Sequence, residues 1–308
     1  MFQTHVRDPR APILTLGYRD QHVWGGMIAV ALWAGGTGAG AYFMSKILLT
    51  TAVISSLTAS ISGWVELIFA ATGIICLTIH LGRPLRFLNA IRRPHTAWIS
   101  RGAIIPPLFV LFVLVSLIPS IPVFSELPWH EGTIAWKVIV IVAMVLAIGY
   151  IMYTGMVIST WNSIPFWNTP LIPIIFTTAS LMGGTAITEI VMAVRGITNP
   201  VIDLFVIGFI SGNVLLIVML IIDARTRERT VKESMHRFLT LGRGICFWGG
   251  VVFIGFIIPM TLVMIDYWVS PEGLTGRIVL VIAGISVLIG GLCQRYCILK
   301  AGRYRLPI

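Results

Sequence analysis

The chain has 308 residues, of which 57% are hydrophobic and only 11% are charged, and its mean hydropathy is +0.93. Because soluble domains carry roughly 25% charged residues, this composition excludes a soluble globular protein and predicts a polytopic membrane protein. The formal net charge of +10 is explained by membrane topology and by attraction to anionic lipid head groups. The net charge therefore does not indicate a nucleic-acid partner. It is also compatible with a cytoplasmic partner protein that has an acidic face.

Residues 1–21 form a polar tail that contains Arg7, Arg10 and Arg19. A short apolar core with a small-residue cleavage site does not follow the tail, so a cleavable signal peptide is not predicted. We expect the first apolar segment to remain in the protein as a membrane-spanning helix.

Eight segments are long and apolar enough to cross a bilayer, which takes about 20 residues in a helix. They are residues 22–49, 58–80, 103–121, 133–158, 170–194, 201–222, 245–265 and 278–299. We predict an all-α integral membrane protein with two four-helix bundles, at 22–160 and 161–300, followed by a C-terminal tail at 301–308. The runs Gly35–Ala39 and Gly183–Ala186 weakly indicate an internal repeat. The first run, extended to Gly40, lies mid-membrane and no strand precedes it, so it predicts close helix packing rather than dinucleotide binding.

Basic residues are concentrated in alternate connections, which indicates the orientation of the protein. Eighteen of the 22 basic residues lie in the two tails, in the loop after the second span and in the loop after the sixth. The opposite loops instead carry Glu126, Glu131, Asp266 and Glu272. The positive-inside rule therefore predicts that both termini face the cytoplasm.

The four cysteines, Cys76, Cys246, Cys293 and Cys297, all fall within apolar segments. Only Cys293 and Cys297 share a helix face, being four residues apart. We expect buried thiols that fill space rather than a disulfide or a metal site.

Ionisable residues inside spans are costly and suggest function. Glu66 and His80 lie 14 residues apart in the second span, on nearly the same helix face and about 21 Å from each other. They are candidates for a proton path, along with Glu189 in the fifth span. Alternatively, Glu66 stays protonated or bonds a neighbouring helix, His80 is an interfacial residue, and Glu189 belongs to an ion-paired structural cluster with Arg195 and Asp203. Asn213, in the middle of the sixth span, is expected to donate a hydrogen bond to another helix.

The stretch 147–174 is typical of a helix end, an aromatic loop and a new helix, with Trp161, Phe166 and Trp167 beside Tyr153 and Thr154. His22, at the start of the first span, lies toward the same membrane face. Imidazole and phenol groups both donate and accept hydrogen bonds, as the carbonyl oxygens of a quinone require. Alone, each residue is equally an interfacial anchor.

A haem group is poorly supported, because the histidines do not occur as pairs inside the spans. His5, His95, His130 and His236 fall in loops or tails, and His22 and His80 touch spans only at an end. We therefore expect neither haem nor metal in this protein, so that electrons arrive from the cofactor of a partner.

Two further motifs resemble a known family. The stretch from His80 to Phe87, HLGRPLRF, followed by Trp98 and by Ser100–Gly102, is similar to the loop after the second span in NrfD-like proteins, the polysulfide reductase membrane subunits. Tyr153–Gly155 and Pro165–Leu171 resemble the fourth and fifth spans of that family, and 24–41 its first helix. The similarity covers most of residues 20–195. Beyond residue 200 it depends on span count and charge pattern.

This resemblance implies a subunit that binds menaquinone or ubiquinone and exchanges electrons with a docked iron–sulfur subunit. That partner usually serves a molybdopterin-type or other redox catalytic subunit. The resemblance implies a quinone pocket lined by His22, Tyr153, Thr154 and Arg83, with Glu66 in proton handling. Many members have an acidic residue where this protein has His80. Some family complexes keep their catalytic subunits outside the cytoplasm, whereas the charge pattern here favours a cytoplasmic partner.

The main hypothesis is thus a quinone-reactive membrane subunit of a respiratory oxidoreductase in the inner (cytoplasmic) membrane. A rival from another class is a proton-coupled secondary transporter, which the weak repeat and the intramembrane acids suggest. A third is a membrane anchor whose quinone site has decayed.

Overall fold

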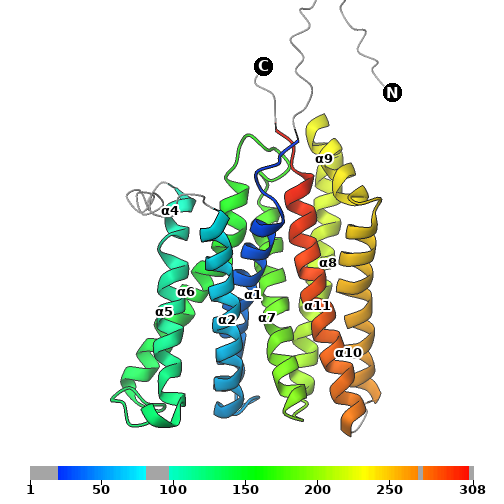
Figure 1. The fold of residues 1–308 in the computed structure, drawn as a ribbon. Coiled ribbons are helices and arrows are strands. Elements are labelled where there is room, and N and C mark those ends of the chain that lie inside the picture. The colour runs from blue at the N-terminus through cyan, green and yellow to red at the C-terminus, as the bar shows by residue number, and fades with distance from the viewer. Residues whose placement is uncertain (1–19, 81–96, 270–272, 305–308) are drawn as a thin grey trace, which may run out of the picture.

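The computed structural model describes residues 20–80, 97–269 and 273–304. Within these ranges eight helical spans are long and apolar enough to cross a membrane (Figure 1). Six are continuous: α1 (Gly26–Thr50), α2 (Ser56–His80), α6 (Ile134–Ser159), α7 (Leu171–Val194), α8 (Pro200–Thr226) and α11 (Gly273–Ala301). The third comprises α4 (Trp98–Gly102) and α5 (Ile105–Leu117) with the short η2 (Ile118–Ser120), and the seventh comprises the π-helical η4 (Ile245–Ile257) and α10 (Ile258–Val269). The predicted all-α membrane fold is confirmed.

Local sequence explains where several of these helices begin. Thr133 caps α6 by accepting a hydrogen bond from the Trp136 amide at 3.2 Å, and Asn199 caps α8 by accepting one from Val201 at 3.0 Å. Both residue types are strong N-caps. Pro200 then occupies the first turn of α8, where its missing N–H has no intrahelical acceptor to lose.

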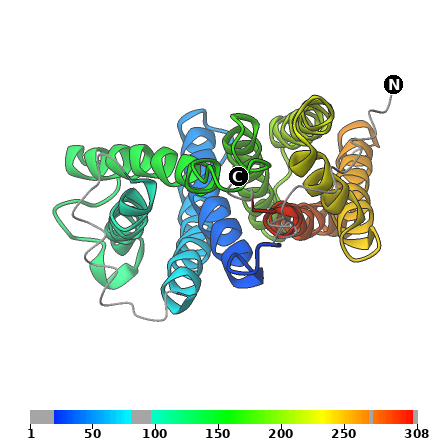
Figure 2. The same ribbon diagram turned by 90° about the horizontal axis from the view of Figure 1, so that it is seen from above.

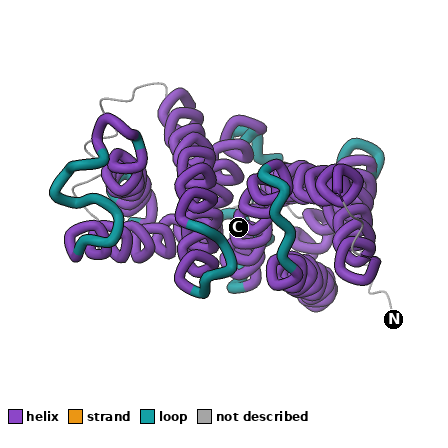
Figure 3. Tube along the Cα trace, turned by 90° about the horizontal axis from the view of Figure 1, so that it is seen from below, coloured by secondary structure: helices purple, strands orange, loops and turns teal. Residues whose placement is uncertain are grey.

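Viewed along the helices, the spans form an elongated array with α5 and α6 at one end and α8 and α10 at the other (Figure 2). The opposite view shows helices joined by loops, with no strand among the described residues (Figure 3). Helix α1 contacts α2, α6, α7 and α11, and α7 also contacts α8. Helices α1 and α7, assigned to different predicted bundles, thus pack against each other, and the division into two four-helix bundles stays a prediction.

The glycine runs bring α1 and α7 into backbone contact, which confirms the close packing predicted for Gly35–Gly40 and identifies α7 as the partner helix. A Cβ atom on Gly40 would overlap the Ser180 carbonyl, and one on Gly184 would overlap the backbone of Gly40 and Ala41. Small residues permit this approach, and close packing is a main source of helix association in bilayers. The α1–α7 contact therefore forms the centre of the array.

The end of α11 holds two distant segments in place. Gln21 donates from Nε2 to the Leu299 carbonyl at 2.9 Å, and Trp167 donates from Nε1 to the Ile298 carbonyl at 2.9 Å. The last carbonyls of a helix lack regular intrahelical donors. Trp167 supplies a donor to Ile298, and Gln21 adds a second donor to Leu299, whose carbonyl also accepts from the Gly302 amide at 3.3 Å. The first described residues and the α6–α7 loop are fastened to α11 in this way.

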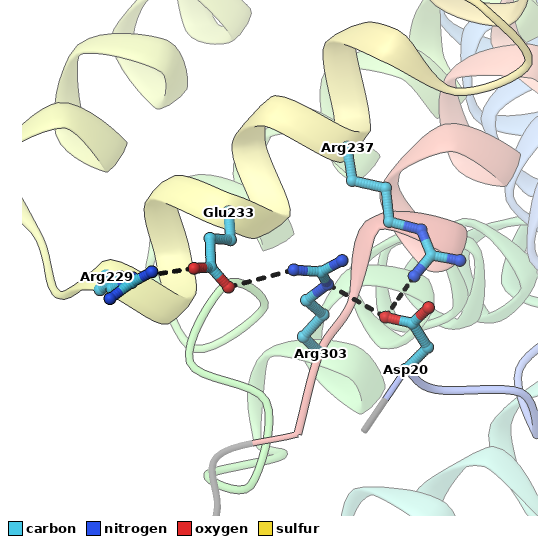
Figure 4. A network of polar contacts seen from close by, with 5 residues as sticks. All are labelled: Asp20, Arg229, Glu233, Arg237 and Arg303. Carbon is cyan, nitrogen blue, oxygen red and sulfur yellow. Dashed lines mark hydrogen bonds and ion pairs between the residues drawn. The ribbon is translucent and has the colours of Figure 1, made fainter. Parts of the chain in front are cut away.

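An ionic network lies outside the spans at the same end (Figure 4). The Asp20 carboxylate pairs with Arg237 of α9 (Arg229–Thr240) and accepts from Arg303 Nε at 3.0 Å. Arg303 also pairs with Glu233, which pairs with Arg229. Although partial burial acts to raise the pKa of Asp20, the two arginines outweigh it and hold the pKa below its usual value. The network joins residues near both ends of the described sequence to α9.

We expect Gly184→Ala to destabilise the protein by about 1–3 kcal/mol, the usual cost of overpacking, because the new methyl group meets backbone that cannot move away cheaply. Thermal unfolding in detergent would measure the loss. Gly208→Ala is the matched control, since a Cβ there meets nothing within 4 Å. Equal stability of the two variants would contradict the proposed role of the α1–α7 contact.

We expect Asp20→Asn to speed hydrogen exchange of residues 20–25 and 299–304 at pH 7. The effect should stay within about 1 kcal/mol, because these ion pairs are partly exposed. A depressed pKa stabilises the folded state above the unfolded value, 3.8, and this contribution is lost as the pH falls through the lower folded value. The variant and wild type should therefore converge in strong acid. Asp223→Asn, which breaks a local α8 pair with Arg227, is the control.

Candidate functional site

Three tryptophans close the end of the array where the first described residues meet the α6–α7 loop. The Trp24 ring packs edge-on against Trp161 and Trp167, with centroids 5.6 and 5.8 Å away. Gln21 orients this segment, because its Oε1 accepts from the Trp24 amide at 2.7 Å. Edge-to-face geometry is a favourable arrangement of aromatic rings. Trp24 therefore completes the aromatic wall that the sequence predicted from the loop alone.

A cleft of about 310 Å³ opens beside this tryptophan cluster, between the start of α4 and the end of α6. It is lined by Ala97, Trp98, Ile99, Thr160, Trp161 and Asn162. The Arg101 guanidinium lies 4.2 Å from the Trp98 ring centroid, which is the geometry of a cation–π contact. Asn162 uses its Oδ1 to accept from Asn168 at 2.8 Å, so its Nδ2 group remains the donor for a ligand. Aromatic faces with a polar edge suit a flat ring that carries oxygen atoms.

Tyr153 lies deeper in the same region, one helical turn inside the predicted end of the fourth span. Its side chain is only 4% exposed, and its ring packs so closely on Gly102 that no Cβ atom would fit there. Because Trp98 and Gly102 belong to the same short helix, α4 connects the cleft to Tyr153. Thr154 is also buried, and its hydroxyl donates to the Ile151 carbonyl at 2.7 Å. It can therefore offer a ligand only acceptor capacity.

Neither His22 nor His80 is buried. His22 is exposed and precedes Trp24 by two residues, and His80 is the exposed last residue of α2. Among the described residues, no hydrogen bond joins His22 to Tyr153. Arg83 lies outside the described residues. The quinone-site assignments of His22, Tyr153, Thr154 and Arg83 stay predictions.

Glu66 is completely buried between α1 and α2 and accepts a hydrogen bond from Ser62 at 2.6 Å through Oε1. Its Oε2 accepts no hydrogen bond of normal geometry among the described residues, although the Ser45 side chain also interacts with this carboxyl group. Lys46, only 4% exposed, interacts electrostatically with Glu66 and places its ammonium 5.1 Å from the Tyr42 ring centroid. Sequence alone did not predict this role for Lys46, because a lysine four residues before a helix end is usually an interfacial residue. A buried acid and a buried base thus share the space between α1 and α2.

Among the described residues, Glu189, Arg195 and Asp203 do not form the ion-paired cluster that the sequence suggested. Arg195 instead donates to Ser55 and Thr58 at the start of α2, because it follows the end of α7 and extends toward that neighbour. Glu189 is buried and neither of its oxygens has a partner among the described residues. It interacts with Asp203 and with Asp266, which is a buried residue of α10 rather than the loop acid that the sequence suggested.

Two further polar residues, Asn213 of α8 and Arg295 of α11, lie inside the spans. Asn213 donates to Thr178 at 2.9 Å and accepts from Gln294 at 2.7 Å, so the predicted interhelical bond is confirmed. Arg295, counted as a tail residue in the charge pattern, is buried inside α11 and donates to Ser180 at 2.9 Å. The assignment to the tail was wrong, because residue 295 lies within the predicted span 278–299 and within α11, which continues to Ala301.

Among the described residues, no group of three or more histidine, cysteine or acidic side chains is arranged to hold a metal ion. The cysteines are not isolated fillers, however. Cys246 and Cys297, which lie 51 residues apart, bring their Sγ atoms to 3.0 Å. The spacing of residues within one helix predicts only the pair Cys293 and Cys297, and it cannot predict a contact between two spans.

Comparisons with known proteins agree with this architecture. A family model described as "Polysulphide reductase, NrfD" matches residues 15–307. "Protein NrfD" of Escherichia coli (strain K12) is 26% identical over 262 residues, covering 75% of this protein and 78% of that one. The C subunit of polysulfide reductase from Wolinella succinogenes is 26% identical over 313 residues, covering 91% and 94%. Because the family model spans nearly the whole sequence, this protein belongs to the NrfD family of membrane subunits of respiratory oxidoreductase complexes.

Proposed function

We propose that this protein is the quinone-reactive membrane subunit of its complex and exchanges electrons with a docked iron–sulfur subunit. That subunit would serve a molybdopterin-type or other redox catalytic subunit. The observation that carries the proposal is the tryptophan-walled cleft that α4 connects to the buried Tyr153. We place the protein in the inner (cytoplasmic) membrane with both termini in the cytoplasm, because the basic loops lie on the side of the two termini.

The residues around the cleft fit a quinone head group. Trp98 and Trp161 offer aromatic faces to a flat ring. Asn162 offers a donor at the mouth. The Tyr153 hydroxyl lies against Gly102 at the other end of α4, and we assign to it the hydrogen bond to the second quinone oxygen. His22 and Arg83 would act at the aqueous edge, and Thr154 would accept a hydrogen bond from a reduced oxygen. When bound, menaquinone or ubiquinone supplies two-electron chemistry coupled to two protons.

Buried titratable groups support proton transfer to and from this site. Glu66 has one carboxylate oxygen that accepts no hydrogen bond of normal geometry. The neighbouring Lys46 interacts electrostatically with this carboxyl group. His80, on the same helix about 21 Å away, lies at the surface where it can exchange protons with water. Glu189 has the same unpartnered character at the opposite end of the array. We assign proton transfer to these three residues.

We expect Tyr153→Phe to weaken quinone affinity about tenfold, because the loss of one hydrogen bond costs roughly 1–1.5 kcal/mol. The ring is retained, so packing against Gly102 and the stability of the fold should not change. Quinol-linked turnover of the intact complex and direct quinone titration would measure the effect.

Tyr150→Phe is the matched control for this experiment. Tyr150 lies one turn earlier on α6, and its hydroxyl is within 3.5 Å of the Ala70 carbonyl rather than beside α4. Equal affinities in wild type and both variants would remove Tyr153 from the site. Solute uptake by the subunit alone in proteoliposomes would favour the proton-coupled transporter instead, and assembly without quinone binding would favour a decayed anchor.

We expect Glu66→Gln to lower turnover of the reconstituted complex at least tenfold while leaving quinone affinity unchanged, because general acid–base transfer typically contributes 10²–10⁴-fold. The amide keeps the hydrogen bond from Ser62 but cannot carry a proton. Proton uptake measured with a pH-sensitive dye in vesicles would report the loss. Glu126→Gln, at an exposed loop residue, is the control, and full activity of Glu66→Gln would exclude a proton path through this residue.

A further inference from the structure

Three of the four cysteines meet between η4 and α11. The Sγ atoms of Cys246 and Cys297 are 3.0 Å apart, and Cys293 also interacts with Cys246. A disulfide needs an S–S separation of about 2.05 Å. Closure of the first pair therefore requires a relative movement of only about 1 Å, while Cys76 lies on α2, on the other side of the array.

The register of two antiparallel segments explains why the thiols meet. Cys246 faces Cys297, while one turn farther along η4 a Cβ atom on Gly250 would lie 2.7 Å from the Cys293 Sγ atom. Farther still, the backbones of Gly255 and Gly290 touch. Small residues thus hold η4 and α11 close along their length, and the thiol pair lies at the end of this seam.

The two thiols differ in accessibility, which assigns their chemical order. Cys297 is completely buried, whereas Cys246 is partly exposed. Cys246 follows a tight turn in which Gly242, Arg243 and Gly244 have positive φ angles of 60°, 60° and 84°. The turn places Cys246 at the very start of its span, next to the polar segment that contains α9. A small aqueous oxidant can reach this thiol first.

We propose that Cys246 and Cys297 form a redox-sensitive thiol pair that a hydroperoxide oxidises to a disulfide. The Cys246 thiolate attacks the peroxide oxygen, so that the O–O bond breaks and a sulfenic acid forms. The Cys297 sulfur then attacks the Cys246 sulfur, and the S–O bond breaks with release of water. In sum, two thiols and one hydrogen peroxide give one disulfide and two waters, with two electrons passing from sulfur to peroxide.

The disulfide would fasten the start of the seventh span to the part of α11 that supports the tryptophan cluster. Ile298, the next residue after Cys297, accepts the hydrogen bond from Trp167 at 2.9 Å. Leu299 accepts from Gln21, which orients Trp24. Oxidation of the thiol pair would thus constrain the end of α11, to which Trp167 is hydrogen-bonded directly and Trp24 through Gln21.

The test uses the full-length protein in detergent, reduced and then exposed to hydrogen peroxide at neutral pH. Remaining thiols are alkylated, and peptides are mapped by mass spectrometry without reduction. We expect two of the four cysteines to become protected and a linked peptide to join Cys246 to Cys297. Cys293→Ser should behave as wild type, whereas Cys246→Ser and Cys297→Ser should each lose the linked peptide. Reduction with dithiothreitol should restore four reactive thiols.

Three results would overturn the proposal. One is the survival of all four thiols under conditions that oxidise an exposed model thiol. Another is a linkage of Cys246 to Cys293 in the wild type. The last is equal cross-linking in folded and detergent-denatured protein, which would show that the fold does not select the pair. Thermal unfolding of the Cys297→Ser variant verifies that it is folded, so that loss of the cross-link is informative.

Discussion

Helices inside a bilayer gain little hydrophobic free energy by associating, so their approach depends on close packing and on polar contacts. In this protein, the contact between α1 and α7 meets that requirement. Gly40 and Gly184 leave no space for side chains, and the two backbones touch. All neighbouring elements are placed relative to this pair, because α1 also packs on α2, α6 and α11. The position of the candidate site at one end of the array follows from it.

Charged groups inside the spans show how the protein offsets a large cost. A charge at the centre of a membrane helix costs at least about 2.5–3.5 kcal/mol. Arg295 is accommodated by Ser180, by a backbone carbonyl and by the face of Phe176, so its partners connect α7 to α11. Glu66 and Glu189 each retain acceptor atoms without described partners. The contacts of Arg295 are typical of a residue that holds two helices together. The carboxylate oxygens of Glu66 and Glu189 that lack described partners can instead take up a proton.

The end of α11 joins the proposed quinone site to the proposed thiol pair. Three consecutive residues there contact Cys246, Trp167 and Gln21. The carbonyls of Ile298 and Leu299 lie in the last turn, where regular intrahelical donors end, so they can accept side-chain hydrogen bonds from other segments. A disulfide at Cys297 would therefore alter the positions of Ile298 and Leu299, which accept the hydrogen bonds from Trp167 and Gln21.

The sequence by itself determined the membrane class, the eight spans and the aromatic loop, because hydropathy over about 20 residues and the position of rings at a helix end are local properties. It also predicted close packing at the glycine run of the first span and an interhelical hydrogen bond from Asn213. It did not reveal Lys46 beside Glu66, Asp266 beside Glu189, the buried position of Arg295, or the contact between Cys246 and Cys297. Those four features depend on which faces of different helices meet, and local sequence patterns do not specify contacts between helices. Tertiary structure alone decided them, since the rotation and register of each span are set by its neighbours rather than by its own residues.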